Sequence, residues 1–158
     1  YDETTGKPIE VAKNIGAPIL IRTKKFYRLW GNSPYNMKKR LNSGPVTVMV
    51  NSQAPSLKYY DSGVIDSKDC EPKVDHAMLA VGYGKYSDPN TDEKKDYVIL
   101  KNSWGRYWGE RGYVRITMSR DQYKSGMCGI FVESYYPVLE TGQNEIDKLY
   151  KKSVGNNA

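Results

Sequence analysis

The chain has 158 residues, a length typical of one domain, and no run of about 20 apolar residues that would predict a membrane span. Its formal charge is +6, from 24 basic and 18 acidic residues that are scattered along the sequence, which favours a solvated surface over a nucleic-acid site. No basic start precedes an apolar stretch, so no signal peptide is predicted, and Tyr1 in first place indicates a processed or truncated piece of a longer protein.

The first third of the chain predicts an irregular segment, one strand and one helix. Residues 1–23 are polar and contain glycine and proline, as expected for connecting chain, and an edge strand is predicted within residues 19–30. Asn32-Ser33-Pro34 predicts a helix start, with a capping residue and a proline in the first turn. We expect this helix to end near Asn42, before a β-branched, apolar strand at residues 46–50.

The rest of the chain predicts strands at short spacings. They cover residues 77–83, 97–101, 113–118 and 129–136, with a charged hairpin loop at 87–95 and a glycine-rich turn at 105–112. Such strands after one helix indicate an α+β fold, an antiparallel sheet or barrel with a helix at one end. Residues 139–158 are a polar tail with a helical turn expected at 146–150, so the domain is predicted to span residues 24–138.

Tyrosine and cysteine are the informative residue types. The 14 tyrosines, against 2 phenylalanines, suit half-buried strands whose rings pack while their hydroxyls reach water. Cys70 and Cys128 are the only cysteines, and with a single histidine they supply no recognisable zinc spacing. Spacing alone does not separate one disulfide from two free thiols.

Two strands end on residues suited to catalysis. The one histidine, His76, precedes the apolar run at 77–83, and taken alone such a histidine is more often structural than catalytic. Asn102 follows the strand at 97–101, and Trp104 comes soon after it. A catalytic histidine needs a partner that fixes its ring and tautomer, and an asparagine oxygen on a neighbouring strand can accept the ring N–H. A tryptophan beside that hydrogen bond shields it from water and strengthens it.

These segments resemble the C-terminal half of papain-like cysteine proteases. The residues that carry the resemblance form four motifs in the family's order: Gly44-Pro45-Val46, Asp75-His76-Ala77 through Gly82-Tyr83-Gly84, Lys101-Asn102-Ser103-Trp104-Gly105 with Trp108-Gly109-Glu110, and Cys128-Gly129-Ile130 with Tyr136-Pro137. Because these motifs span most of residues 24–138, chance agreement is remote. The resemblance implies a papain-like fold, here its right-hand, β-barrel-like half without the helical half.

The resemblance implies a role for each motif residue. His76 is expected to act as general base and acid in an ion pair with a cysteine thiolate, while Asn102 orients the imidazole. Trp104 is expected to cover this pair and floor the leaving-group side of the cleft, and Trp108 to pack behind it. Asp75 is expected to be an electrostatic neighbour of the histidine, not a proton carrier. No cofactor or metal is implied.

The two cysteines occupy positions that resemble those of a family disulfide. The resemblance therefore favours a Cys70–Cys128 bridge over free thiols, and 128 − 70 = 58 residues of separation would contribute about 4 kcal/mol by the chain-entropy estimate. A disulfide implies an oxidising compartment, which for this family means a lysosomal, vacuolar or secreted protein.

Glu133 occupies the position that family members place at the bottom of the main specificity pocket. A carboxylate there can pair with an arginine two residues before the scissile bond, while walls formed by Met49, Val74 and Ala77 still accept aliphatic or aromatic side chains. The alternative is that Glu133 turns to solvent and the pocket is merely apolar.

The sequence departs from the family in one decisive respect. It contains no segment of the Gln-x-x-x-x-x-Cys type, so the nucleophile and the oxyanion-hole glutamine of the family are both missing. We expect the cysteine-bearing half to be a separate chain or a removed segment, and the whole to cleave peptides as an endopeptidase. Two alternatives are a papain-like domain retired from catalysis within an assembly, and a free-standing binding module such as an inhibitor or lectin.

Overall fold

The computed structural model describes residues 23–88, 92–120 and 122–140. Its contacts divide the chain into a larger unit, residues 26–137, and a smaller unit, residues 1–25 with 138–158, of which only short strand ends are described. The predicted irregular chain at 1–22 and the helical turn at 146–150 lie outside the described residues. No helix within the described ranges is long and apolar enough to cross a membrane.

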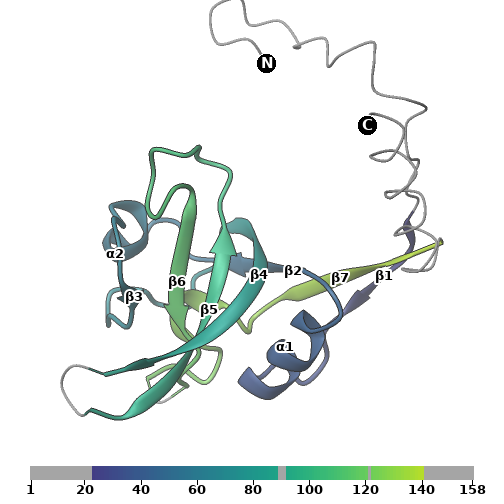
Figure 1. Ribbon diagram of the computed structural model, residues 1–158, viewed down its shortest axis with the longest axis horizontal. Helices are drawn as coiled ribbons and strands as arrows, with labels where there is room; N and C mark the ends of the chain where they lie inside the picture. The colour runs from purple at the N-terminus through teal and green to yellow at the C-terminus, as the bar shows by residue number, and fades with distance from the viewer. Residues whose placement is uncertain (1–22, 89–91, 121, 141–158) are drawn as a thin grey trace, which may run out of the picture. The chain divides into compact units, whose positions relative to one another are not determined.

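Seven strands form one sheet in the order β1-β7-β2-β4-β5-β6-β3 (Figure 1). Their bounds are β1 Thr23–Arg28, β2 Val46–Val50, β3 Val64–Ile65, β4 His76–Ser87, β5 Lys94–Lys101, β6 Tyr113–Thr117 and β7 Ser134–Leu139. The pairs β2–β4, β4–β5, β5–β6 and β2–β7 are antiparallel, as predicted, and β1 is an edge strand. The short β3, which was not predicted, pairs parallel with β6, so the sheet is mixed.

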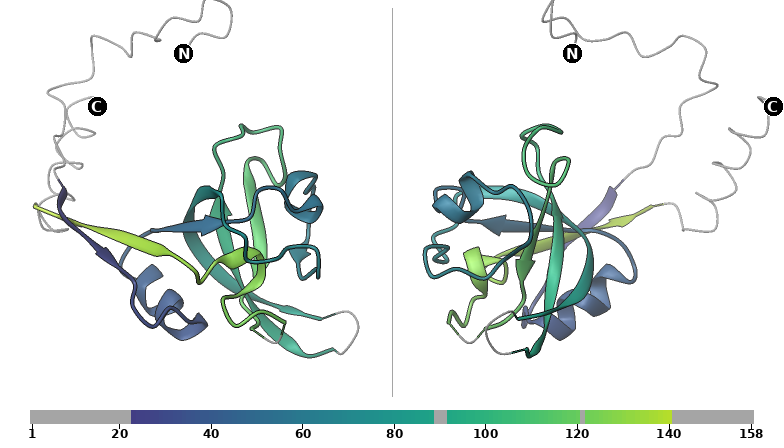
Figure 2. Two further views of the ribbon diagram at one scale, coloured as in Figure 1. Left: turned by 180° about the vertical axis from the view of Figure 1, so that it is seen from behind. Right: turned by 60° about the vertical axis from the view of Figure 1, so that its left-hand side comes forward.

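The main helix begins and ends close to the predicted residues. Helix α1 spans Pro34–Leu41, and the Ser33 side chain accepts a hydrogen bond from the backbone N–H of Asn36 at 3.3 Å. This is the expected cap, in which a hydroxyl satisfies one of the free donors of the first turn. A second helix, α2 at Pro55–Lys58, is a single turn that begins at a proline and was not predicted. In the views of Figure 2, α1 lies on the β1–β7 side of the sheet and α2 lies beside β3.

The predicted strand at 129–136 begins later than expected, at Ser134. Met127–Gly129 forms a 3-10 turn instead, in which Cys128 and Gly129 have positive φ values of 54° and 83°. Gly129 is required there, because a Cβ atom would lie 2.4 Å from Cγ1 of Val74. The turn thus lets the chain pass close beneath the segment that leads into β4.

The β4–β5 hairpin is longer than the predicted strands, and it enters the predicted charged loop at Ser87 and Lys94. The register pair Lys85↔Asp96 places opposite charges across from each other. The Lys95 ammonium also forms ion pairs with Asp66 at 3.3 Å and Asp88 at 2.6 Å. Cross-strand charge pairs therefore stabilise strands that lack an apolar pattern.

The core lies on the inner face of the sheet. Alternate residues of the strands are buried there, as the period of a strand requires: Val46, Val48, Val50, Met78, Ala80, Val98, Leu100, Val114 and Ile116. Met37 of α1 and Leu57 of α2 complete the same cluster together with both cysteines. The sheet is thereby held rigid where its strand ends carry the motif residues.

Candidate active site

His76 and Asn102 meet at the ends of two strands. His76 is the first residue of β4, opposite Val50 of β2, and Asn102 directly follows the last residue of β5. Nε2 of His76 lies 2.9 Å from Oδ1 of Asn102. The asparagine is held in place because its backbone N–H donates to the Gly112 carbonyl at 2.9 Å, and the residue is only 8% exposed. The sequence-based expectation of this proximity thus describes the geometry correctly.

The asparagine side chain has only one possible orientation. Its Oδ1 also accepts the backbone N–H of Ser103 at 2.8 Å, so the atom shared by both contacts must be the oxygen. An oxygen can only accept, which means that Nε2 of His76 carries the proton. In the neutral imidazole Nδ1 is then the basic nitrogen, available to take a proton from a group facing it.

A row of three aromatic rings begins at the imidazole of His76. The Trp104 ring stacks on the imidazole at 5.1 Å and 22°, and Trp108 meets Trp104 edge-on at 5.2 Å. Trp108 in turn packs against Tyr60 at 5.7 Å, and its Nε1–H donates to the Lys58 carbonyl at 3.2 Å. Trp104 therefore lies where a shield was predicted, and Trp108 packs behind it.

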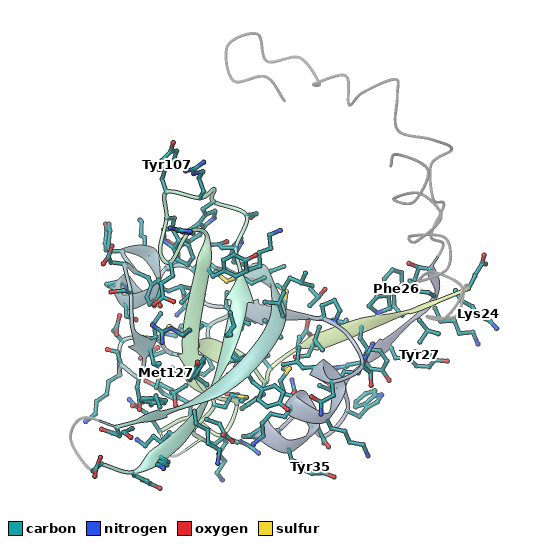
Figure 3. All side chains as sticks on the ribbon, viewed as in Figure 1. Lys24, Phe26, Tyr27, Tyr35, Tyr107 and Met127 are labelled. Atoms are coloured by element: carbon teal, nitrogen blue, oxygen red, sulfur yellow. A yellow bond between two sulfur atoms is a disulfide. The ribbon has the colours of Figure 1, made fainter. Side chains whose placement is uncertain are left out.

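The loop between β5 and β6 holds these tryptophans by its glycines and one ion pair. Gly109 has a φ of 55°, and a Cβ atom there would lie 2.7 Å from the Tyr113 carbonyl. The Glu110 carboxylate accepts from Nε of Arg115 at 2.9 Å and from the backbone N–H of Gly63 at 3.0 Å. Hydrogen bonding by Arg115 is the main cause that holds the pKa of Glu110 below its usual range. The loop stands out from the end of the sheet, with Tyr107 at its tip (Figure 3).

Asp75 makes its contacts with the chain after β2. Its carboxylate accepts from the backbone N–H of Ser52 at 2.7 Å and from Nε2 of Gln53 at 3.1 Å. The Ser52 backbone hydrogen bond is the largest cause that lowers the pKa of Asp75, with smaller contributions from Gln53 and from the charge of His76. A carboxylate held ionised in this way is suited to tie down the loop beside His76.

The predicted specificity-pocket residues lie around the β2–β4 pair. Met49 is directly opposite Ala77, and the Met49 backbone N–H donates to the Glu133 carbonyl at 3.0 Å. Val74 contacts the turn at Gly129. Within the described ranges the Glu133 side chain, which is partly exposed, has no hydrogen bond or ion pair. The structure thus pairs Met49 with Ala77 and places the backbone of Glu133 beside Met49.

The two cysteines form a disulfide beneath this site. Cys70 and Cys128 are bonded, and both are fully buried. The Cys128 backbone N–H donates to the Cys70 carbonyl at 2.7 Å, and its carbonyl accepts from Asn51 at 2.9 Å. The bridge therefore joins the 3-10 turn to the segment that leads to His76, and the Asn51 hydrogen bond attaches the end of β2 to the same turn. With both sulfurs bonded to each other, this sequence offers no thiol to the imidazole.

Three contacts of the site were not anticipated from the sequence. They are the hydrogen bonds of Asp75 to residues 52–53, the support of Trp108 by Tyr60, and the Glu110–Arg115 ion pair. Burial is the main cause that raises the pKa of Tyr60, whose hydroxyl donates to the Gly63 carbonyl at 2.6 Å. In the sequence, only the dipeptide Tyr59-Tyr60 could have indicated an aromatic support there.

Comparison with known proteins agrees with this geometry. Residues 1–138 match the model of the family described as "Papain family cysteine protease". Papaya proteinase 4 of Carica papaya is 36% identical over 127 residues, 80% of this chain and 34% of that protein. Chymopapain, from the same plant, is 37% identical over 117 residues, 74% of this chain and 31% of that protein. The chain thus spans about a third of the length of these relatives.

Solved structures show the same fold. Bromelain protease from Ananas comosus, in complex with an inhibitor, superposes with a TM-score of 0.64 at 38% identity, over 75% of this chain and 51% of that one. The ragweed pollen allergen Amb a 11, a cysteine protease in its proform, superposes with a TM-score of 0.64 at 25% identity, over 77% of this chain and 34% of that one. This chain, with its histidine and asparagine at paired strand ends, therefore belongs to the papain family of cysteine proteases.

Proposed function

We propose that this chain supplies the histidine and the asparagine of a papain-type cysteine endopeptidase whose nucleophilic cysteine lies on the other half of the protease. The observation that carries the proposal is the 2.9 Å contact between Nε2 of His76 and an asparagine oxygen of fixed orientation. Such a contact leaves Nδ1 as the basic nitrogen. A protein with a purely structural role has no need to fix the tautomer of a histidine in this way.

The proposed chemistry uses His76 twice. Nδ1 takes the proton of the cysteine thiol, and the thiolate attacks the substrate carbonyl carbon to form a tetrahedral intermediate. The C–N bond then breaks while Nδ1–H protonates the leaving amine. The acyl group remains on the cysteine sulfur as a thioester. Nδ1 next takes a proton from water, whose oxygen displaces the cysteine sulfur and releases the acid. Asn102 holds the imidazole throughout, and Trp104 keeps water from their hydrogen bond.

Two features support a cysteine-bearing half as the partner. The outward side chains of β4 are exposed and largely apolar, with Leu79, Val81 and Tyr83 exposed by 36%, 42% and 40%. The Nδ2 group of Asn102 is buried, and it has no acceptor among the residues that the structure describes. A buried donor without a partner is costly, so an acceptor on the missing half would stabilise the assembled site. The buried disulfide fits assembly in an oxidising compartment, for which we propose a vacuole, a lysosome or the cell exterior.

Affinity labelling tests the proposal directly. The chain, isolated from its source or co-expressed with a cysteine-bearing papain-type half, is treated with an epoxide inhibitor of thiol proteases and analysed by native mass spectrometry. We expect a complex labelled once, on the partner cysteine. His76→Ala should abolish the labelling, and Asn102→Ala should slow it about tenfold or more, the cost of one hydrogen bond to a charged group. A native complex that contains a cysteine-bearing half yet stays unlabelled would instead identify a domain retired from catalysis.

We further propose that Glu133 lets the specificity pocket take arginine as well as apolar side chains. The support is a partly exposed carboxylate that has no partner among the described residues, next to Met49 and Ala77, the predicted walls. Glu133→Gln keeps the shape and removes the charge. We expect the ratio of kcat/KM for matched arginine and leucine peptides to fall about tenfold, with the leucine value unchanged as the internal control. An unaltered ratio would mean that Glu133 does not contact the substrate.

A further inference from the structure

A cavity lies away from the candidate active site, between α1 and the β1–β7 edge of the sheet. Its volume is about 390 Å³, and the lining side chains used below are Arg28, Trp30, Lys39, Arg40 and Tyr136. Residue 136 follows Tyr135, which pairs with Thr47 near the start of β2, whereas His76 faces Val50 at its end. Thr47 and Val50 are three residues apart, so the two positions are separated by about 10 Å along β2 alone. In Figure 3, Tyr35 of α1 and Tyr107, at the tip of the loop between β5 and β6, lie at opposite ends of the larger unit.

Among the described residues, the side chains that line the cavity include three cations and no carboxylate. Arg28, Lys39 and Arg40 contribute three positive charges, and none of them forms an ion pair within residues 23–88, 92–120 and 122–140. Lys38, which directly precedes Lys39 in α1, differs in this respect because it pairs with Asp96. Three cations without a counter-charge around one cavity create a local positive potential that favours an anionic ligand.

Both arginines are held in place by aromatic rings. The Arg40 guanidinium lies 4.2 Å from the centre of the Tyr136 ring, and the Arg28 guanidinium lies 5.1 Å from that of Trp30. A guanidinium stacked on a ring keeps its N–H groups in its own plane, free to donate sideways. Arg28 uses one of them on the Val132 carbonyl at 3.3 Å. Nε of Arg40 is buried and has no acceptor among the described residues.

A buried, unpartnered guanidinium N–H beside further free donors indicates an absent acceptor. Planar guanidinium groups match the paired oxygens of sulfate and phosphate. The volume admits an oxyanion together with a body of about the size of a sugar ring, which the exposed Trp30 ring can contact. We propose that this cavity, the α1 pocket, binds a sulfate or phosphate monoester, with Arg40 and Arg28 holding the oxyanion and Lys39 adding charge.

The position of the pocket suggests what such binding would achieve. An ester carried on a larger molecule would be held at α1 while the strand ends at His76 and Asn102 remain open. The chain would then be retained on a sulfated or phosphorylated material without loss of access to the candidate active site. This inference does not depend on whether the chain is catalytically active, and its test uses no protease activity.

The test is an NMR titration of the 158-residue chain, or of its complex if one is isolated, at constant ionic strength. The probes are glucose 6-sulfate, glucose 6-phosphate and inorganic phosphate, with glucose as the neutral control, and the reporters are the Trp30 indole N–H and the arginine Nε–H signals. We expect saturable shifts with at least one ester and none with glucose. A stronger response to the sulfate or to the phosphate ester identifies the source of the oxyanion.

Variants separate a built site from general attraction to a basic protein. Arg40→Met should weaken ester binding about tenfold or more, Arg28→Gln about fivefold, and Arg40→Lys by an intermediate factor, because it keeps the charge and loses the planar fork. Arg106 is the matched control, since it stacks 5.3 Å over Tyr107, which is 94% exposed. Arg106→Gln should change the affinity less than twofold. Equal affinities in Arg28→Gln and Arg106→Gln, binding of inorganic phosphate without either ester, or no saturable shift would each overturn the proposal.

Discussion

The two faces of strand β4 have opposite surroundings. Met78 and Ala80 point inward and are 3% and 0% exposed, while Leu79 and Val81 point outward and are 36% and 42% exposed. The inward residues meet β2, β5 and the core cluster, all supplied by this chain. The outward residues are equally apolar, yet no core cluster of the described residues includes them.

This difference separates what the chain needs in order to fold from what it needs in order to act. The core cluster, the disulfide and α1 are all made of residues of this chain. His76 begins the same strand and is itself partly exposed, with its ring between Asn102 and Trp104. In our proposal the outward face contacts the cysteine-bearing half, whose cysteine reaches the imidazole at the end of the strand, where His76 is the first residue.

The largest expected effect contrasts two neighbouring residues of β4. Met78→Asp removes a buried side chain and places an unpaired carboxylate in the core, which together cost more than about 5 kcal/mol. Since total stability is typically about 5–15 kcal/mol, we expect little folded protein. Leu79→Asp places the same carboxylate on the outward face, opposite Lys101, and should shift stability by less than about 1 kcal/mol. Urea unfolding followed by near-UV circular dichroism measures both.

The outward substitution has a second readout. Leu79→Asp should reduce recovery of the complex with a cysteine-bearing half in native mass spectrometry, although the chain itself remains folded. If Leu79→Asp instead unfolds the chain as completely as Met78→Asp, the outward face is part of the core and the contrast between the two faces fails.

The next largest expected effect is the loss of stability on removal of the disulfide, which belongs to the core on the inward face. Replacing both Cys70 and Cys128 by alanine keeps the site apolar and opens a crosslink over a sequence separation of 58 residues. The chain-entropy estimate predicts a loss of about 4 kcal/mol. Unfolding of the wild type with and without a reducing agent should give the same difference. If the double variant is as stable as the oxidised chain, the bridge does not constrain the unfolded state as assumed.

The sequence allowed good prediction wherever a local pattern decides the structure. The β-branched run at 46–50 is a strand with the predicted bounds, and Ser33-Pro34 begins the helix because capping is a local interaction. The meeting of His76 with Asn102 and the Cys70–Cys128 bridge are long-range, and they became predictable only through the family resemblance. The residues themselves left free thiols and a disulfide undecided.

Prediction failed where contacts distant in sequence decide the structure. The two-residue strand β3 exists because it pairs with β6, and the charged end of the β4–β5 hairpin exists because opposite charges face each other. The start of β7 is delayed because the disulfide turn imposes positive φ at Cys128 and Gly129. The α1 pocket was missed for a similar reason: its cations come from a strand and a helix whose closeness no sequence period indicates.

The smallest expected effect concerns Asp75, which directly precedes β4 and binds the chain after β2. The Ser52 backbone hydrogen bond, aided by Gln53, lowers its pKa in the folded state, so ionised Asp75 contributes stability above its unfolded pKa of about 3.9. That contribution is lost as the pH falls through the lower, folded-state pKa. Because Asp75 is exposed, we expect Asp75→Ala to cost less than about 1 kcal/mol at pH 7.

The measurement is the urea midpoint of wild type and Asp75→Ala at pH 7, 5 and 3. The difference should persist between pH 7 and 5 and shrink towards pH 3, as protonation removes the same hydrogen bonds in the wild type that the substitution removes at every pH. Asp61→Ala is the control, because the Asp61 side chain contacts only the neighbouring Ser62 hydroxyl among the described residues. A difference that stays constant down to pH 3 would mean that Asp75 stabilises the loop by packing, and that its charge is not what holds residues 52–53 beside His76.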